Sequence, residues 1–158
     1  MRGIFLALFL AVGTLAIAQE KSCNLWLGDA SESNNILKQF VEKNLEIQTK
    51  LVPAETNNIQ EMRDENNLAQ IKIWLKPKKV LVNGAMATVN TISSYKIVSL
   101  SEQIDKLYAE LVKQVQPCTT ETTAMNTVFG NNKIFIERNS GGFGKKGLPM
   151  STVTITAR

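Results

Sequence analysis

Residues 71–84, IKIWLKPKKVLVNG, decide the fold of this chain. Polar and apolar side chains alternate in the first half of the stretch, which is typical of a strand with one buried face. One face carries Ile71, Ile73 and Leu75, and the other carries Lys72, Trp74 and Lys76. We therefore expect the first face to meet the core and the second to point away from it.

The second half of the stretch and the residues after it predict a β-meander. Pro77-Lys78 predicts a turn, and residues 79–82 predict a second strand. Asn83-Gly84 indicates a hairpin, because both residues tolerate the positive φ of a type I′ turn. A third strand is expected from Met86 to Val98, with a bend near Ser93-Ser94.

Apolar residues then recur at the spacing of an α-helix. They are Ile104, Leu107, Tyr108, Leu111, Val112 and Val115. A stripe of this kind indicates a helix with one buried face. Ser99 and Glu102 predict a capping box at its start. Glu102 is also spaced to pair with Lys106, and Pro117 ends the helix.

The chain ahead of the meander predicts a strand, a helix and a polar stretch. Residues 23–27 alternate in character, which is strand-like. Asp29, Ser31 and Ser33 each offer an N-cap oxygen for a helix whose apolar residues lie between 36 and 45. Residues 47–51 predict a short strand, and residues 57–67 have a polar composition that is compatible with a helix.

Residues 128–129, 133–138 and 151–157 indicate further strands after the second helix, with Gly130-Asn131-Asn132 between the first two. The expected order is strand, helix, strands, helix, strands. This order predicts an α+β fold with two helices packed on one face of a mostly antiparallel sheet. We expect a ferredoxin-like core of the split βαβ kind with an added β-meander.

Residues 1–18 have the features of a secretory signal peptide. Arg2 precedes an apolar run from Ile4 to Val12, and Ala16-Ile17-Ala18 forms a small-x-small cleavage site. The run has about half the length that a membrane-spanning helix needs, which argues against a retained anchor. We expect residues 19–158 to form a single periplasmic or secreted domain without stable membrane insertion.

The chain contains two cysteines, Cys23 and Cys118, and both lie within the expected mature domain. In an oxidising compartment we expect them to form a disulfide bond. Two free thiols are the alternative, because the sequence does not place the two Cα atoms within bonding range.

The residue types that support most catalytic and metal sites are missing. The sequence contains no histidine, which removes Ser-His-Asp and Cys-His nucleophilic sites and every imidazole metal site. The two cysteines are too far apart in the sequence for a metal cluster or a redox pair. We therefore expect no metal, no cofactor and a non-enzymatic function.

A small secreted hydrolase that uses carboxylates, similar to a glycosidase, is the alternative. Glu61, Asp64 and Glu65 lie within about one helical turn if their segment is a helix. A glycosidase needs two carboxyl groups roughly 5 to 9.5 Å apart across a cleft. Adjacent acids on a polar segment are more often a solvated surface, so no catalytic residue is assigned.

Residues 139–147, NSGGFGKKG, invite comparison with a phosphate-binding loop. That motif needs glycine in place of Asn139 and serine or threonine in place of Lys146, followed by a helix. The stretch is therefore read as a loop between two strands. Phe143, Lys145 and Lys146 are candidates for contact with an anionic partner.

Charge is unevenly distributed along the expected mature chain. Residues 66–100 contain five lysines and no acid, whereas residues 19–65 contain nine acids and five bases. Such asymmetry attracts anionic polymers or acidic protein surfaces. The alternative is that exposed lysines keep strand edges from pairing with other chains. Nucleic acid is disfavoured by the modest net charge of +4 and by the secretory address.

These observations predict an exported binding module for an anionic envelope component or an acidic protein surface. Lys72, Trp74 and Lys76 are the central candidates. An indole between two ammonium groups can stack on a sugar ring or an apolar patch while the lysines meet carboxylates or phosphates. The competing interpretation is that lysine stems or a second layer bury the indole.

Overall fold

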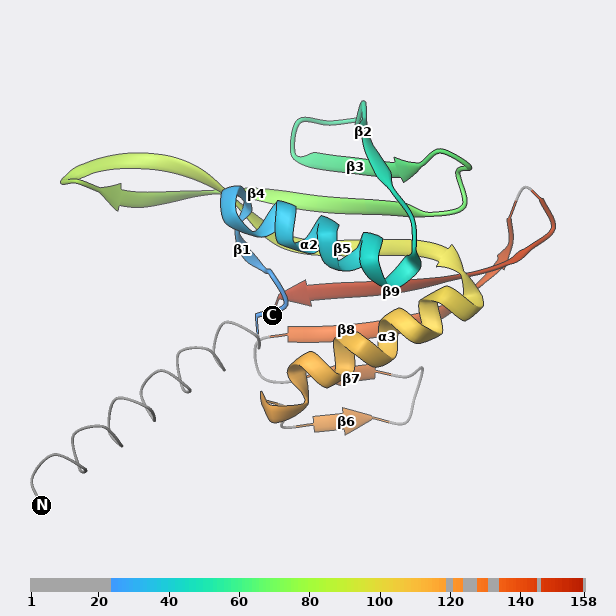
Figure 1. Ribbon diagram of the computed structural model, residues 1–158. Helices are drawn as coiled ribbons and strands as arrows, with labels where there is room; N and C mark the ends of the chain where they lie inside the picture. The colour runs from blue at the N-terminus through green and yellow to red at the C-terminus, as the bar shows by residue number, and fades with distance from the viewer. Residues whose placement is uncertain (1–23, 119–120, 124–127, 131–133, 145, 158) are drawn as a thin grey trace, which may run out of the picture.

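The computed structural model describes residues 24–118, 121–123, 128–130, 134–144 and 146–157 (Figure 1). The expected signal peptide, Cys23 and Lys145 lie outside these residues. Export, cleavage after Ala18 and the Cys23–Cys118 bridge therefore stay predictions. Among the described residues, no helix combines the length and the apolar character that crossing a membrane requires.

The described elements alternate between helices and antiparallel strands. They are β1 (Gly28–Asp29), α2 (Ala30–Leu45), β2 (Thr49–Val52), β3 (Ile59–Asp64), β4 (Gln70–Val82), β5 (Ala85–Leu100), α3 (Ser101–Val115), the 3₁₀ turn η1 (Gln116–Cys118), β6 (Glu121–Thr123), β7 (Val128–Gly130), β8 (Ile134–Phe143) and β9 (Pro149–Ala157). The strands form one sheet with the order β2-β3-β4-β5-β9-β8-β7-β6, and β1 pairs with β5. Both helices lie on the same side of this sheet (Figure 1). The predicted α+β class is confirmed.

Each helix leads into a meander, β2–β5 after α2 and β6–β9 after α3. Every described pairing is antiparallel, so β1 and β2 run in the same direction with other strands between them. The same holds for β5 and β6. Both helices are thus crossovers of the split βαβ kind, and the meanders widen the sheet well beyond a ferredoxin-like core.

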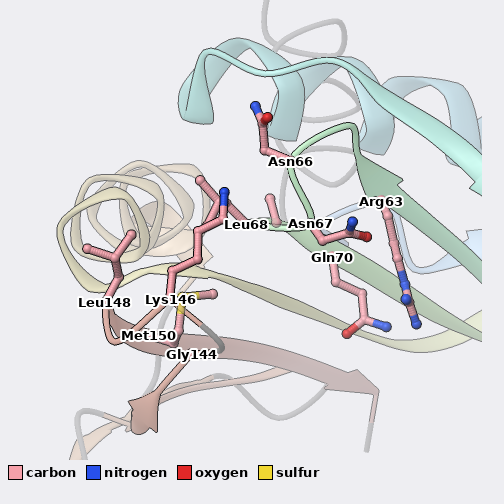
Figure 2. Close-up of a pocket in the computed structure, with 10 residues that line it drawn as sticks. Arg63, Asn66, Asn67, Leu68, Gln70, Gly144, Lys146, Leu148 and Met150 are labelled. Atoms are coloured by element: carbon pink, nitrogen blue, oxygen red, sulfur yellow. The ribbon is translucent and has the colours of Figure 1, made fainter.

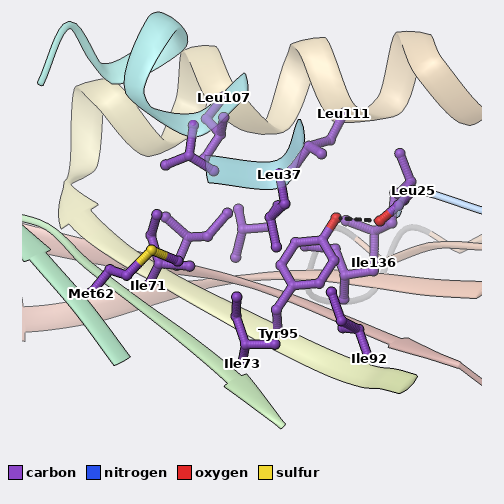
Figure 3. Packing of buried hydrophobic residues seen from close by; sticks show 14 of the residues in the cluster. Leu25, Leu37, Met62, Ile71, Ile73, Ile92, Tyr95, Leu107, Leu111 and Ile136 are labelled. Atoms are coloured by element: carbon purple, nitrogen blue, oxygen red, sulfur yellow. Dashed lines mark hydrogen bonds between the residues drawn. The ribbon is translucent and has the colours of Figure 1, made fainter. Parts of the chain in front are cut away.

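The core lies between the helices and the sheet. Ile71, Ile73 and Leu75 of β4 are at most 5% exposed and face the helices, as their alternation predicts. The apolar stripe of α3 supplies Leu107 and Leu111, which point toward the sheet (Figure 3). The other buried members of the stripe are Ile104 and Val115. The sequence therefore placed the core face of both elements correctly.

Tyr95 fixes the start of the domain to the centre of the sheet. Its side chain is fully buried, and its hydroxyl donates to the Leu25 carbonyl oxygen at 3.0 Å (Figure 3). The predicted strand at residues 23–27 is wrong over its described part, because Leu25 and Trp26 have φ of 43° and 61° and the chain turns there. Leu25 enters the core and Trp26 packs on Phe40, with ring centroids 4.6 Å apart. Two neighbouring apolar residues, one buried and one partly buried, therefore both pack against the core without forming a strand.

The predicted turn at Pro77-Lys78 is also wrong, because β4 continues through both residues to Val82. Its register with β3 ends at Trp74, so Pro77 lies where one edge of the strand is open. Strands tolerate proline at such edges, where a missing N–H costs no ladder bond. The Asn83-Gly84 turn is confirmed, with φ of 50° and 80°.

Residues 57–67 form the strand β3 and its flanking turns rather than a polar helix. Met62 is buried opposite Ile71 in the β3–β4 ladder, and this pairing overrides a composition that either structure can accept. The strand expected at residues 47–51 is confirmed as β2, one to two residues later along the chain.

The start of α3 differs from the predicted capping box. Leu100 occupies the N-cap position and makes no side-chain cap. Ser99 belongs to β5, where it pairs with Ser151, and its hydroxyl donates to Gln103 Oε1 at 2.6 Å. The predicted pair of Glu102 and Lys106 is present at 3.7 Å. Ser99 therefore has the backbone pairing of a strand and does not cap α3.

Candidate functional site

The side of the sheet that points away from the helices is the candidate binding surface, called here the open face. Its side chains alternate along each strand with the buried residues of the core. They include Glu61 and Arg63 of β3, Gln70, Lys72 and Trp74 of β4, Ser94, Lys96 and Val98 of β5, Thr152, Thr154 and Thr156 of β9, and Glu137 and Asn139 of β8. No described helix covers this face (Figure 1). The predicted outward orientation of Lys72 and Trp74 follows from the same alternation.

The centre of the open face holds two lysines side by side. Lys72 of β4 is the register partner of Lys96 of β5, so two ammonium groups project from directly opposed positions. Like charges in this arrangement are destabilising. On the other side of Lys72, the register partner is Glu61 of β3. On β9 the register partner of Lys96 is Thr154, and the next residue in the row is Glu137 of β8. The row therefore contains two carboxylates for two cations, but the two lysines lie next to each other and the acids lie outside them.

Glu61 is buried but stays ionised. Burial raises its pKa, but hydrogen bonds from Gln70 and Arg63 and the positive charges of Arg63 and Lys72 outweigh this effect. The pKa is therefore held below its ordinary value of 4.5. Gln70 Nε2 and Arg63 Nε each donate to Glu61 Oε1 at 2.6 Å. A carboxyl group in this state is a counter-charge and not a proton donor at neutral pH.

Trp74 stands at the border of a shallow pocket on the same face. Lys72 Nζ lies 5.9 Å from the centroid of the indole ring, within the range of a cation–π contact. The pocket has a volume of about 340 Å³, and Lys76, Asn58, Leu75, Ala157 and four residues with hydroxyl groups also line it. The hydroxyl-bearing residues are Ser93, Ser94, Thr154 and Thr156. Of the residues singled out in the sequence, Lys72 thus lies over the Trp74 ring and Lys76 shares the pocket with Trp74.

The glycine-rich segment contributes to a different pocket. Lys146 lines a cavity of about 600 Å³ together with Arg63, Gln70 and the turn between β3 and β4 (Figure 2). Phe143, at the end of β8, is 80% exposed and does not line that cavity. Lys145 lies outside the described residues. The two predicted groups of binding residues therefore do not form a single pocket.

Comparisons with known proteins add no further candidate. No protein-family model, no curated protein and no solved structure matches this chain. Within the described part of the chain, no group of three or more histidine, cysteine or acidic side chains is arranged to hold a metal ion. The function is therefore argued from the geometry of the open face.

The three acids considered for hydrolysis do not face one another. Asp64 lies on the helix side of β3, opposite to Glu61, and its carboxylate accepts the N–H groups of Ala69 at 2.6 Å and Asn66 at 3.1 Å. Asp64 thereby stabilises the β3–β4 turn. Glu65 is exposed and pairs with Lys50 at 2.5 Å. This arrangement offers no pair of carboxyl groups across a cleft.

Sequence reasoning missed Lys96 and the row of threonines on β9. Lys96 alternates with Tyr95 and Ile97, a signal that places it on the outer face of its strand. Its position beside Lys72 depends on the β4–β5 register, which is shifted by a bulge between Trp74 and Leu75. The alternation of side chains along a strand does not predict such a bulge.

Proposed function

We propose that the protein is an exported, non-enzymatic binding module whose open face recognises an anionic polysaccharide of the cell envelope. The observation that carries the proposal is the pocket at Trp74, whose lining includes this tryptophan, four hydroxyl-bearing residues and Lys76. Export itself rests on the signal-peptide features of residues 1–18.

The chemistry of the pocket matches a sugar acid. A sugar ring presents C–H groups that pack on an indole face and hydroxyls that exchange hydrogen bonds with serine and threonine. A carboxylate on the same sugar would meet Lys76. An acidic peptide would use the lysines but has less use for the indole and the hydroxyl groups.

The central lysines supply a second reason. Lys72 and Lys96 occupy directly opposed positions, where like charges are destabilising. An anion bound between them would offset that effect. Strands place alternate side chains about 6.8 Å apart, so Lys72, Trp74 and Lys76 form a line along β4. A linear polymer with regularly spaced carboxylates can follow that line.

The proposal is tested by measuring the binding of alginate, a polyuronate, against neutral dextran of similar length. We expect alginate to bind, dextran not to bind, and affinity to fall as salt increases. Trp26 and Trp74 are the two tryptophans of the chain. In a Trp26→Phe background, which keeps an aromatic ring against Phe40, a change in emission on binding reports on Trp74 alone.

Trp74→Ala should weaken alginate binding about tenfold, and Lys72→Gln with Lys76→Gln should weaken it at low salt more than at high salt. The matched control is Lys106→Gln with Lys113→Gln, which removes the same charge from exposed positions on α3. Poly-L-glutamate that binds as tightly as alginate, with no effect of Trp74→Ala, would indicate an acidic protein partner and would reject the polysaccharide. Failure of both polymers to bind would reject the open face as a site for anionic polymers.

A further inference from the structure

The β4–β5 hairpin extends beyond the rest of the sheet as a two-stranded arm, defined here as residues 77–88. Within the arm, each strand pairs only with the other in the described structure. The β3 register ends at Trp74, and β1 pairs with β5 no closer to the tip than Thr91. The arm projects away from both helices and from β9 (Figure 1). It belongs to neither pocket described above.

The tip of the arm exposes apolar side chains. Leu81 is 69% exposed, Val82 is 48% exposed and Met86 is 65% exposed. Leu81 and Met86 are register partners and share one face of the ribbon, whereas Val82 lies on the other face. An isolated two-stranded ribbon is only marginally stable in water. Apolar residues this exposed on both faces of the ribbon gain little burial from the fold and point to an occupant that surrounds the tip.

Behind the tip, the arm is basic. Lys78 and Lys79 are exposed, Lys76 is exposed at the base, and the arm contains no acid. Lys79 lies two residues before Leu81, which corresponds to about 7 Å along a strand. Interfacial elements bury their apolar side chains about 5–10 Å into the boundary between headgroups and acyl chains. Lysines at this distance from the tip would reach the level of the lipid phosphates.

We propose that the arm docks the protein on an anionic phospholipid bilayer. Leu81, Val82 and Met86 enter the headgroup–acyl boundary, and Lys78 and Lys79 contact the phosphates. A bilayer surrounds the tip and so covers both faces of the ribbon, whereas a flat protein surface covers one. Docking of this kind is peripheral and reversible, because three apolar side chains are far fewer than a membrane span requires.

The test uses the purified protein, with its N-terminus determined by intact mass, and co-sedimentation with vesicles. We expect binding to vesicles of phosphatidylcholine mixed with phosphatidylglycerol, and little binding to phosphatidylcholine alone. Lys78→Gln with Lys79→Gln should weaken binding about 25-fold, since each lysine near an anionic surface contributes about fivefold. Leu81→Ser with Met86→Ser should weaken it about tenfold.

Two matched controls keep the same chemical changes away from the arm. Leu51→Ser alters an apolar side chain that is 71% exposed on β2, and Lys106→Gln with Lys113→Gln alters two exposed lysines on α3. Both should bind the mixed vesicles like the unmodified protein. Circular dichroism should show that all variants fold, because every substituted side chain is exposed or half-exposed.

A direct readout comes from Leu81→Trp in a background with Trp26→Phe and Trp74→Phe. Its emission should shift to the blue on mixed vesicles and be quenched by brominated acyl chains. The proposal is overturned if the unmodified protein does not bind mixed vesicles, if arm and control variants bind equally, or if the new indole stays in water. Alginate binding should be unchanged by the arm variants, so failure of either proposal leaves the other intact.

Discussion

Glu61 illustrates how the register of a sheet creates a charge arrangement that composition does not reveal. The residue is 5% exposed, yet Arg63, Gln70 and Lys72 surround its carboxylate with two hydrogen bonds and two positive charges. Each of these partners lies on β3 itself or on the neighbouring strand β4. The acid therefore helps to hold the basic centre of the open face together.

Glu61→Gln should lower the free energy of unfolding by about 1–2 kcal/mol at neutral pH, because a charged acceptor of two hydrogen bonds is replaced by a neutral amide. The folded-state pKa is below the ordinary 4.5, so the ionised form stabilises the fold above that pH. This contribution is lost as the pH falls through the folded-state pKa. The difference between the variant and the parent in urea unfolding should therefore shrink between about pH 7 and pH 3.

The control is Glu65→Gln, which removes a carboxylate that is 69% exposed and pairs with exposed Lys50. We expect little change in stability, because solvent screens such pairs. A difference for Glu61→Gln that is equally large at both pH values would show that packing, and not charge, explains the effect.

At the residue scale, alternation in the sequence was sufficient to place Ile71 and Ile73 in the core and Trp74 outside it. It was not sufficient to place Lys96 beside Lys72 or Glu61 in the same row. A period of two determines the face of a strand, but the partner of each residue depends on register. In this sheet the register also contains a bulge beside Trp74.

At the element scale, the arm shows the strength and the limit of turn signals. Asn83-Gly84 was a reliable predictor, because both residues adopt the positive φ that a type I′ turn needs. Pro77 was misleading, because its effect depends on whether the neighbouring strand is still present. The helix considered for residues 57–67 was wrong for the same reason, because pairing with β4 determines the structure of β3.

The arm should open locally without unfolding the domain. Amides of residues 79–88 should exchange with deuterium much faster than those of residues 71–75, of which 71–74 pair with both β3 and β5. Gly84→Ala should reduce protection in the arm further, because Gly84 has φ of 80° and a left-handed conformation costs alanine about 1 kcal/mol. The thermal midpoint of the domain should stay nearly constant.

Gly142→Ala is the matched control, since a Cβ at either Gly84 or Gly142 meets nothing within 4 Å but only Gly84 has a left-handed φ. It should leave exchange in the arm unchanged. Slow exchange at residues 79–88 comparable to that of residues 71–75 would mean that the arm is covered in solution.

At the scale of the whole molecule, the two halves of the sheet are joined by pairing between segments that are distant in the sequence. Ser94 of β5 pairs with Thr156 of β9, and α3 with three further strands lies between them in the chain. Local patterns predicted the class of the fold, because each helix and most strands have one apolar face. Those patterns did not predict the order of the strands in the sheet, because the periodicity of a strand is the same whichever strands lie beside it.

The expected Cys23–Cys118 bridge would act at this scale. Cys118 is the last residue of η1, directly after α3, and Cys23 precedes Leu25, whose carbonyl is held by Tyr95. The bridge would close a loop of about 95 residues, for which loop-closure entropy gives an upper figure of about 4–5 kcal/mol of stabilisation.

We expect the exported protein to begin at Gln19, to react with no thiol-alkylating reagent until it is reduced, and to unfold at a lower temperature after reduction. Intact mass before and after reduction and alkylation measures the first two properties, and Cys23→Ser with Cys118→Ser should unfold at a temperature that no longer depends on reductant. A mass that retains residues 1–18 would reject the cleavage site, and two alkylated thiols in the unreduced protein would reject the bridge.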